Sequence, residues 1–345
     1  MKIVDLRSDT VTVPTAAMRE AMSRAEVGDD VMREDPTVNR LQELAAEKMG
    51  KEAGLFVPSG TMGNLVAILA HCGRGDEAIL GNLGHTFLFE GGGIAALGGV
   101  HSYILPNQPD GSLDLESVRA AVRPDDVHAP VSRLVILENT HNRCGGTVLS
   151  VDYMRAAGAL VRELGLRLHV DGARIFNAAA ALDVPVTELV RDADSVTFCL
   201  SKGLWAPVGS VLCGSREFID RARRMRKHLG GGMRQAGVLA AAGMVALEEM
   251  TGRLVEDHRR AKALANGLEG VAGILLDTPD PASNMVFVSL GEDTPMDAAA
   301  AAAALNGSGV KVGVTGKRKI RMVTHYWVDD EGVEQTVQAF RGLIQ

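Results

Sequence analysis

Short apolar segments alternate with amphipathic segments along the first two thirds of the chain. The apolar segments are rich in branched aliphatic residues, a composition typical of buried strands. They lie at 55–57, 78–80, 102–105, 134–137, 167–170, 195–200 and 210–212. Between them, segments such as 61–70 and 151–164 carry apolar residues at helical spacing. This alternation predicts an α/β fold in which a mostly parallel sheet has helices on both faces.

Two helices are expected before the first strand. Pro14 opens the first, whose apolar positions follow helical spacing as far as Ala25. The second is marked at both ends, with Asp35 as N-cap, Pro36 at the first helical position and Gly50 as the stop. The segment before Pro14 is short and mixed, and its pattern predicts no element.

The last third of the chain predicts a smaller α/β domain. Helices are expected at 240–249 and 252–270, a strand at 285–290, an alanine-rich helix around 298–305, a strand at 320–323 and a final helix from Asp330. We therefore divide the chain into an N-terminal arm with a large domain at 1–250 and a small C-terminal domain at 251–345. Ligands of such a sheet are expected at the carboxyl ends of its strands.

Composition and charge narrow the classes of function. The 345 residues are 46% hydrophobic and 23% charged, which favours a globular fold over disorder. The formal net charge of −7 disfavours nucleic-acid binding, which depends on neutralising phosphates with Lys and Arg. No apolar run reaches the ~18 residues of a membrane span, and the N-terminus lacks the basic start and apolar stretch of a signal peptide.

Cysteine and histidine spacing predicts no metal site. The four cysteines are scattered without a C-x-x-C pair, and the nine histidines include no H-x-x-H or H-E-x-x-H pair. Scattered cysteines form neither a disulfide scaffold nor a zinc site, and they fit a reducing compartment. The cytoplasm is therefore the expected location.

One segment has the composition of a phosphate-binding loop. PSGTMGN at 58–64 follows an expected strand and opens an expected helix. Gly60 lets the backbone approach a ligand, and Thr61 offers a hydroxyl beside the free amides of the first helical turn. Taken alone, the segment is equally compatible with a plain capped turn.

Two further polar groups follow strands. Asp171 stands at the end of 167–170, with Arg174 three residues later, and such a carboxylate holds a protonated heterocyclic nitrogen or pairs with the arginine. Lys202 follows 195–200, where a buried ammonium is costly unless it has a task, and lysine forms Schiff bases. Pyridoxal phosphate needs phosphate binding, a carboxylate for the ring nitrogen and a Schiff-base lysine, so the three elements together predict this cofactor.

Several segments of the chain resemble the low-specificity L-threonine aldolase family. They are DLRSDTVT at 5–12, EDPT at 34–37, PSGTMGN at 58–64, ENTHN at 138–142, HVDGARIFN at 169–177, SKGL at 201–204 and GGGMRQ at 230–235. The resemblance runs from residue 5 to at least residue 327. It implies a homotetramer of fold-type-I subunits with shared active sites, which cleaves threonine or allo-threonine to glycine and acetaldehyde.

The resemblance also implies how the cofactor is held. Lys202 matches the Schiff-base lysine, and Asp171 matches the partner of the pyridine nitrogen. Gly60 and Thr61 match the phosphate loop, and His85 matches the histidine that stacks on the ring.

Substrate and subunit contacts are implied in the same way. Ser8, Arg174 and Arg321 match the groups that hold the substrate carboxylate, with Arg174 also serving the phenolic oxygen of the cofactor. Lys227 and Arg234 match basic residues that reach the cofactor phosphate of a neighbouring subunit.

A proton must leave the β-hydroxyl as the aldehyde departs, and imidazole titrates near neutrality. His85 and His128, which matches a second family histidine near that hydroxyl, are both candidates for this base, directly or through a water. The sequence does not choose between them.

The chain departs from the family pattern at two places. Relatives usually show Asp-Asp-Val-Tyr-Gly before EDP, whereas this chain has Met32 and Arg33 in place of the tyrosine and glycine. Ala129 also follows His128 where a bulky aromatic residue is common. Because Met32 would line the substrate pocket, we expect tolerance for larger or anionic side chains, as in phenylserine or 3-hydroxyaspartate.

Three alternatives stay open. Segment 91–96 (GGGIAA) matches G-x-G-x-x-A, the pattern of nicotinamide dehydrogenases, although the residues before it make a poor parallel strand. Another lyase, racemase or aminotransferase of the same cofactor class would share Lys202 and Asp171. A non-catalytic relative is disfavoured because Lys202, Asp171, His85 and Arg321 are all present.

Overall fold

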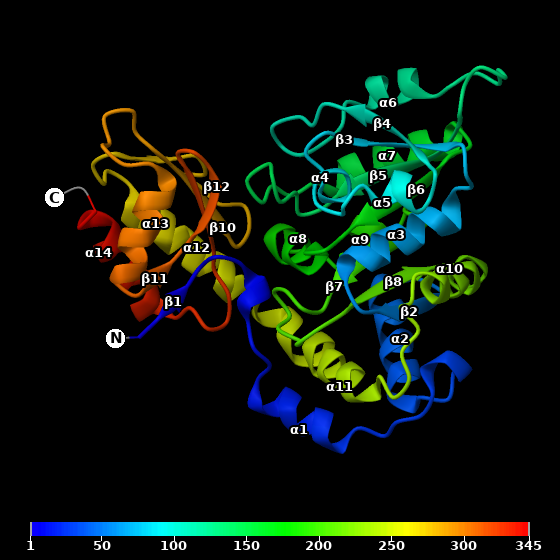
Figure 1. Ribbon diagram of the computed structural model, residues 1–345, viewed down its shortest axis with the longest axis horizontal. Coiled ribbons are helices and arrows are strands. Elements are labelled where there is room, and N and C mark those ends of the chain that lie inside the picture. Colours follow the sequence, from blue (N-terminus) through cyan, green and yellow to red (C-terminus); the bar gives the residue numbers. More distant parts are fainter. Residues whose placement is uncertain (1, 344–345) are drawn as a thin grey trace.

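A twisted central sheet organises the larger part of the molecule (Figure 1). The computed structural model describes residues 2–343. In spatial order the strands of this sheet are β2 (Ala53–Val57), β8 (Ser210–Gly214), β7 (Ser195–Cys199), β6 (Arg167–Asp171), β5 (Val131–Glu138), β3 (Asp76–Gly81) and β4 (His101–Leu105). All pairs are parallel except those of β8, which is antiparallel to both β2 and β7. The predicted α/β fold with a mostly parallel sheet is confirmed.

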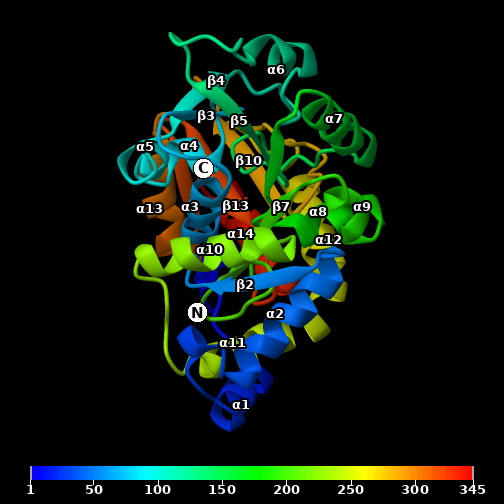
Figure 2. The same ribbon diagram turned by 90° about the vertical axis from the view of Figure 1, so that its right-hand side faces the viewer.

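Helices cover both faces of this sheet. Figure 2 shows α3 (Gly60–His71) and α10 (Arg216–His228) on one side, and α7 (Val151–Glu163), α8 (Ile175–Leu182) and α9 (Val186–Val190) on the other. The other helices of this part are α1 (Ala16–Arg24), α2 (Pro36–Met49), α4 (His85–Leu88), α5 (Gly93–Ala96), α6 (Leu115–Ala121) and α11 (Gly237–Val245), with the short turns η1 (Asp9–Val11), η2 (Asp30–Met32), η3 (Ala246–Met250) and η4 (Thr251–Arg253).

The C-terminal part has its own sheet and core. An antiparallel sheet takes the order β12 (Gly313–Gly316), β13 (Lys319–Val323), β10 (Met285–Leu290) and β9 (Ile274–Leu276), and it is joined by α12 (Leu254–Leu268), α13 (Ala298–Gly307) and α14 (Asp330–Arg341). The N-terminal β1 (Val4–Asp5) pairs in parallel with β11 (Val310–Lys311). Val4 and Leu6 are buried in the same apolar cluster as Phe340, so the arm packs on the C-terminal part. The exact domain boundary at residue 250 stays a prediction.

Local sequence signals explain where the first helices begin and end. Asp35 caps α2 by accepting a hydrogen bond from the Val38 amide at 3.0 Å, and Gly50 ends it with a positive φ of 62°, both as predicted. The first helix begins at Ala16 rather than Pro14, because Thr15 is the N-cap and its hydroxyl accepts from the Met18 amide at 3.2 Å. Among residues 2–343, no helix is both long and apolar enough to cross a membrane.

Candidate active site

A cavity of about 290 Å³ opens at the carboxyl ends of β6 and β7. Gly60, Thr61, His85, Asp171 and Lys202 all line it. The fold therefore brings together the residues that sequence analysis assigned to the phosphate, the ring and the Schiff base. The cavity lies where parallel strands end and their connections diverge, which is the usual ligand position in such sheets.

The phosphate-binding loop is a capped helix start. Ser59 caps α3, its hydroxyl accepting from the Met62 amide at 3.1 Å. The amides of Gly60 and Thr61 precede the first intrahelical hydrogen bond and are free to bind an anion. A Cβ atom on Gly60 would lie 2.9 Å from Cys199 Sγ, so a side chain at this position would crowd the floor of the loop.

Asp171 is buried at the end of β6 and is held by three donors. Its Oδ2 accepts from Asn64 Nδ2 at 2.9 Å and from the Thr86 hydroxyl at 3.4 Å, and its Oδ1 accepts from the Ala173 amide at 3.2 Å. These contacts fix the direction of the carboxylate within the cavity. Lys202, in the loop between β7 and β8, lines the same cavity.

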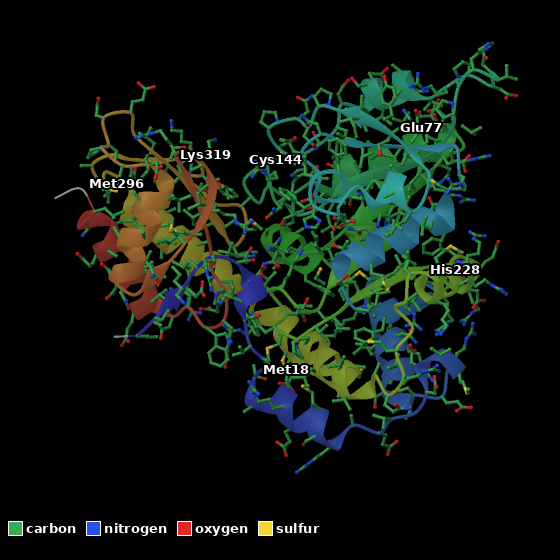
Figure 3. The ribbon with its side chains drawn as sticks, in the orientation of Figure 1. Met18, Glu77, Cys144, His228, Met296 and Lys319 are labelled. Atoms are coloured by element: carbon green, nitrogen blue, oxygen red, sulfur yellow. The ribbon has the colours of Figure 1, made fainter. Side chains whose placement is uncertain are left out.

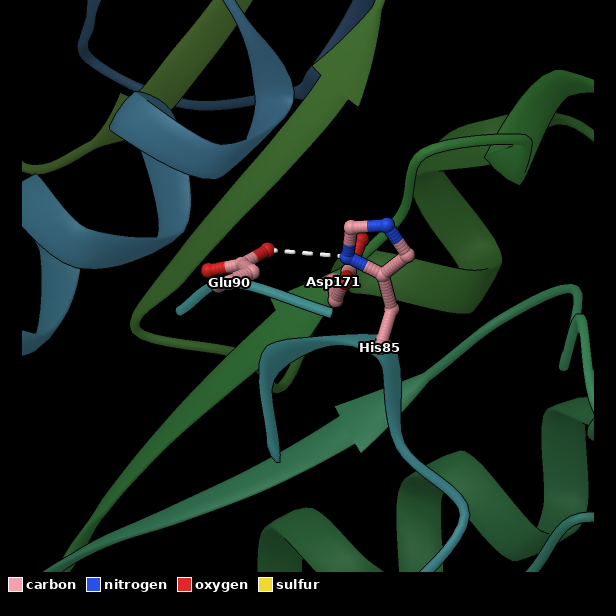
Figure 4. Close-up of side chains that lie close together, drawn as sticks. All are labelled: His85, Glu90 and Asp171. Carbon is pink, nitrogen blue, oxygen red and sulfur yellow. Dashed lines mark hydrogen bonds and ion pairs between the residues drawn. The ribbon is translucent and has the colours of Figure 1, made fainter. Parts of the chain in front are cut away.

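His85 begins α4 and is paired with a buried carboxylate (Figure 4). Glu90 Oε1 accepts a hydrogen bond from His85 Nδ1 at 3.0 Å, and the same oxygen accepts from Asn64 Nδ2 at 2.9 Å. The bond to Glu90 raises the pKa of His85 above its usual value, against the opposing effect of burial. Burial raises the pKa of Glu90 itself, although its bond to His85 opposes this.

These three groups also have the spacing of a metal site. One ligand atom each from His85, Glu90 and Asp171 lies within 4.8 Å of the others. The amide of Asn64, however, donates to both carboxylates, and His85 donates to Glu90. Hydrogen bonds therefore account for the arrangement without a cation.

Arg174 and Arg321 lie next to the N-terminal arm, and neither lines the cavity itself, although Ala173, the residue before Arg174, does. Arg174 donates from Nε and Nη2 to the two oxygens of Asp9 at 2.7 and 2.6 Å, and both side chains are buried. Burial alone would raise the pKa of Asp9, but Arg174 lowers it to about 2. Arg321 donates from Nη1 to Asn142 Oδ1 at 2.8 Å, and its buried Nε has no partner within residues 2–343.

Known proteins with similar sequences belong to the family that the residues of the cavity indicate. The family described as Beta-eliminating lyase matches residues 5–290. A probable low-specificity L-threonine aldolase 2 of Arabidopsis thaliana is 48% identical over 99% of this chain and 98% of its own length. The low specificity L-threonine aldolase of Escherichia coli strain K12 is 46% identical over 99% of each chain. This chain belongs to the low-specificity L-threonine aldolase family.

Solved structures support the fold of a threonine aldolase. The threonine aldolase of Leishmania major matches with a TM-score of 0.84 and 22% identity over 99% of this chain and 100% of its own. A serine palmitoyltransferase of Sphingomonas wittichii matches with a TM-score of 0.77 and 20% identity over 99% and 87%. At this identity the likeness shows the fold alone, which is fold type I of pyridoxal phosphate enzymes.

The aldolase cavity fits pyridoxal phosphate on three observations. The start of α3 presents free amides where only a glycine fits, which suits a phosphate. Asp171 is a buried, oriented carboxylate that suits a protonated ring nitrogen. Lys202 is the amine on the same cavity.

Other residues that the aldolase resemblance pointed to lie outside this cavity. His128 is on the 122–130 loop after α6, its side chain 89% exposed and its Nδ1 2.8 Å from Asp126. That loop precedes β5, and Glu138, at the far end of this strand, contacts the His85 amide, so about 25 Å of strand separates them. Within one chain, His128 and His85 therefore do not meet.

The predicted subunit contacts also face outward. Lys227 is in the last turn of α10, and Figure 3 shows the next residue, His228, at the outer edge of the molecule. Arg234 donates to Asp29 at 2.8 Å on the exposed segment after α10. Met32 is 66% exposed, and the neighbouring Arg33 pairs with Asp220 at 2.8 Å. None of these lines the cavity, so their roles stay predictions that require a second chain.

Ser8 and the dinucleotide motif have local explanations. The Ser8 hydroxyl caps η1 by accepting from the Thr10 amide at 3.2 Å, and Thr10 lines the cavity. The GGGIAA segment covers the two residues before α5 and the whole of α5, and it follows helix α4, not a strand. The strand-turn-helix geometry of a dinucleotide-binding motif is therefore missing, and the dehydrogenase alternative is wrong.

Sequence reasoning missed three residues of the site. Asn64 belongs to the PSGTMGN segment, whose pattern predicts no separate role for it, although it stands one helical turn after Gly60 on α3. Glu90 lies five positions after His85 in a glycine-rich stretch where no periodicity pointed to it. Asp9 belongs to the DLRSDTVT segment, and its pairing with Arg174 joins positions 165 apart in sequence.

Proposed function

We propose that this chain is a pyridoxal phosphate-dependent carbon–carbon lyase that cleaves L-threonine, L-allo-threonine and related L-β-hydroxy-α-amino acids to glycine and an aldehyde. The observation that carries the proposal is the single cavity shared by Lys202, Asp171, His85 and the amide end of α3. Family membership supports the aldol reaction in particular.

Each group of the cavity has a binding task. Pyridoxal phosphate, when bound, supplies an electron sink for the pair left on Cα. The amides of Gly60 and Thr61 bind the phosphate, and the Asp171 carboxylate accepts the hydrogen bond of the protonated ring nitrogen. Lys202 provides the amine that carries the cofactor.

His85 is the proposed base for the β-hydroxyl proton. Because Glu90 accepts from Nδ1, the neutral imidazole carries its proton there and leaves Nε2 free to accept one. The raised pKa makes this nitrogen a stronger base, so the buried Glu90 acts as a positioning and activating residue. His128 keeps its candidacy for the same proton only through a neighbouring chain, since its own loop is remote.

Arg321, Arg174 and Ser8 are the proposed contacts of the substrate carboxylate. Arg321 is the best placed, because its buried Nε has no hydrogen-bond partner among the described residues and its Nη2 donates to the Arg7 carbonyl of the arm. Arg174 is engaged by Asp9 through two of its nitrogens, so it contributes mainly charge and Nη1. A fixed carboxylate orients the bond that breaks, which is how positioning lowers the barrier.

We propose that the enzyme works as a homotetramer in the cytoplasm. The basic side chains of Lys227 and Arg234 and the exposed Met32 all lie on surfaces outside their own cavity. In a dimer of dimers they would complete a neighbouring site, Lys227 and Arg234 at its cofactor phosphate and Met32 at its substrate pocket.

A second candidate reaction is β-elimination on a β-substituted amino acid, which the family description Beta-eliminating lyase favours. Preference for phenylserine or 3-hydroxyaspartate over threonine is a further variant, motivated by Met32 and Ala129. All three share Lys202 and Asp171, so the products distinguish them.

Product analysis of the cofactor-loaded enzyme tests the proposal. L-threonine, L-allo-threonine, their D isomers, phenylserine and 3-hydroxyaspartate are offered, and glycine, aldehyde, ammonia and keto acid are quantified. Glycine with aldehyde from the L substrates supports the aldolase. Ammonia with a keto acid would replace it by the eliminating lyase, and a higher rate with phenylserine or 3-hydroxyaspartate would assign the preferred substrate.

A further inference from the structure

A continuous series of hydrogen bonds, buried except for the part-buried last one at His71, leads away from Asp171 along the large sheet. Asn64 Nδ2 donates to Asp171 Oδ2 at 2.9 Å, and Asn64 Oδ1 lies 3.2 Å from His169 Nε2. His169 Nδ1 lies 2.9 Å from Ser195 Oγ, which lies 2.8 Å from His71 Nε2. This series of bonds thus links strands β6 and β7 to Asn64, in the N-terminal half of helix α3, and to His71, its last residue.

Two carboxylates fix the orientation of the Asn64 amide. Its Nδ2 lies 2.9 Å from Asp171 Oδ2 and 2.9 Å from Glu90 Oε1, and each carboxylate requires a donor. The amino group has two hydrogens, one for each acid. The opposite amide orientation would direct its carbonyl oxygen at both acids, so Oδ1 must face His169.

The amide orientation then sets the direction of every other bond. Facing a carbonyl oxygen, His169 Nε2 must carry the proton, and Nδ1 of the neutral ring is an acceptor. Ser195 therefore donates its hydroxyl proton to His169 Nδ1, and its oxygen accepts from His71 Nε2–H. All four bonds donate toward Asp171, so their dipoles align and strengthen one another.

Burial keeps both histidines of the chain neutral. Desolvation lowers the pKa of His169 to about 4, although Asp171 and a backbone hydrogen bond with Ser195 oppose this, and it lowers that of His71 to about 3, with His169 adding to the effect. His169 and Ser195 have no exposed surface, and His71 is packed on Phe218 with ring centroids 4.4 Å apart. None of these three side chains lines the active-site cavity.

We infer that Asn64 is the positioning residue that ties the cofactor carboxylate Asp171 to the His85–Glu90 pair, and that His169 and Ser195 hold its amide in the working orientation. The inference rests on the proposed function of the cavity. One amide serves both acids, so the group facing the ring nitrogen and the group activating the base share a single support. Without it, the two buried carboxylates would lose the one donor they share, leaving Asp171 to Thr86 and Ala173 and Glu90 to His85.

Three single variants test whether the loss of cofactor affinity becomes smaller with distance from Asp171 along this series of hydrogen bonds. Asn64→Ala removes the shared donor, and we expect binding of pyridoxal phosphate to weaken by about 10- to 100-fold. Ser195→Ala removes the hydrogen bond to His169 Nδ1, and within this series His169 is linked to Asp171 only through Asn64. We therefore expect Ser195→Ala to weaken cofactor binding by less than Asn64→Ala does. His71→Phe keeps the stacking on Phe218 and should have the smallest effect.

The control is a buried asparagine away from the cavity. Asn284 is fully buried and donates one amide hydrogen bond to the Thr324 carbonyl at 3.0 Å. Asn284→Ala also removes a buried amide hydrogen bond, but one that lies outside the cavity. Comparing the two variants therefore separates a loss of folding stability from a loss of carboxylate positioning. Cofactor affinity unchanged in Asn284→Ala and weakened in Asn64→Ala supports the inference. Equal losses in the two variants, or unchanged affinity in Asn64→Ala, would overturn it.

The direction of the bonds is tested without activity. In protein with ¹⁵N-labelled histidine, His169 is identified by its absence in the His169→Gln spectrum. We expect the neutral tautomer with the proton on Nε2, unchanged across the neutral pH range and the same with and without cofactor. A proton on Nδ1, or a titration near neutrality, would contradict the assigned polarity.

Failure of this inference and failure of the proposed function look different. If the wild-type protein binds the cofactor but releases no glycine from any substrate, the reaction is wrong while the variant series still reports on positioning. If the wild type is an active aldolase and Asn64→Ala binds the cofactor equally well, only the inference on Asn64 fails.

Discussion

His85 Nδ1 and Glu90 Oε1 form a hydrogen bond of 3.0 Å in which the carboxylate is 4% exposed and the imidazole is one-third exposed. The buried charge therefore acts on a ring that still reaches the cavity. This raises the pKa of His85 and fixes its tautomer, which are the two properties that a base for the β-hydroxyl proton needs.

Replacing Glu90 by Gln keeps a hydrogen-bond acceptor for His85 but removes the charge. The pKa of His85 then falls, so the rising limb of kcat/KM against pH moves to lower pH, because the base is deprotonated earlier. The weaker base lowers the plateau by about tenfold or more. The measurement is the pH profile of aldehyde release.

Glu77 offers a matched control for this variant. It is a buried glutamate on β3 that pairs with His101 of the edge strand β4 at 2.9 Å, and Figure 3 shows it far from the C-terminal part. Glu77→Gln lowers stability but leaves the pH profile in place. An unshifted profile in Glu90→Gln would argue against His85 as the base.

Asp9→Asn leaves the buried guanidinium of Arg174 without a counter-charge. We expect a loss of about 3–5 kcal/mol in the free energy of unfolding, as for other broken buried pairs. Asp5→Asn is the control in the same arm, because its partner Arg7 is half exposed and such pairs contribute little. Urea titration of both variants measures the difference, and equal small losses would count against the buried pair.

The same ion pair predicts acid sensitivity. The pKa of Asp9 is lowered to about 2 in the folded protein from 3.8, so its stabilisation is present above the unfolded value and is lost as pH falls toward 2. The stability difference between wild type and Asp9→Asn therefore shrinks below about pH 4. A difference independent of pH would contradict this.

Asp257 predicts the opposite dependence. Burial raises the pKa of its carboxyl from 3.8 to about 7, only partly offset by Arg253 and Arg260, and neither oxygen has a hydrogen-bond partner among the described residues. A raised pKa means that stability is lost as pH rises through 7. Asp257→Asn is therefore stabilised over wild type by a margin that grows from about pH 4 to pH 7, up to about 4 kcal/mol.

Denaturant unfolding at several pH values measures this margin. Asp280→Asn is the control, since Asp280 is exposed in a surface pair with Lys262 and gives a flat difference. A constant margin for Asp257→Asn across the same range would show that its carboxyl titrates normally.

Gly60→Ala tests the phosphate loop. The added Cβ would lie 2.9 Å from Cys199 Sγ, so the start of α3 must shift and cofactor affinity is expected to fall by about tenfold. Cys199→Ala in the same chain removes the sulfur and should restore most of the loss. Gly252→Ala, where nothing lies within 4 Å of the new Cβ, is the neutral control. The measurement is equilibrium binding of pyridoxal phosphate to the wild type, Gly60→Ala, the double variant Gly60→Ala with Cys199→Ala, and Gly252→Ala. Unchanged affinity in Gly60→Ala would contradict the role of the start of α3 in binding the phosphate.

Much of the fold was predictable because its signals are local. The caps of α2 and the apolar strands before Asp171 and Lys202 need only neighbouring residues to be recognised. The alternation of strands and helices predicts a mostly parallel sheet, yet β8 is antiparallel because a loop without a helix joins it to β7. β1 pairs with β11 across 306 positions, and only two residues of each strand take part. A strand of two residues is too short to show the alternation of apolar and polar residues that would predict it.

Site residues that follow a strand could be predicted from the sequence. Site residues that act through another residue could not. Asp171 and Lys202 stand at strand ends, which is a sequence signal. Asn64 and Glu90 act through hydrogen bonds to residues that are distant in sequence or outside any regular pattern. Residue spacing does not predict such contacts. His128 is the reverse case, because the family resemblance predicts a role for it whereas its side chain is exposed and does not line the cavity of its own chain.

The central claim is retro-aldol cleavage at the Lys202 cavity. The most direct measurement is the stoichiometry of glycine and acetaldehyde released from L-allo-threonine and L-threonine by the cofactor-loaded enzyme, with Lys202→Ala as the blank. The account predicts equal amounts of both products from the wild type and none from the blank. Cofactor-loaded wild type that consumes neither substrate, or release that persists in Lys202→Ala, would contradict it.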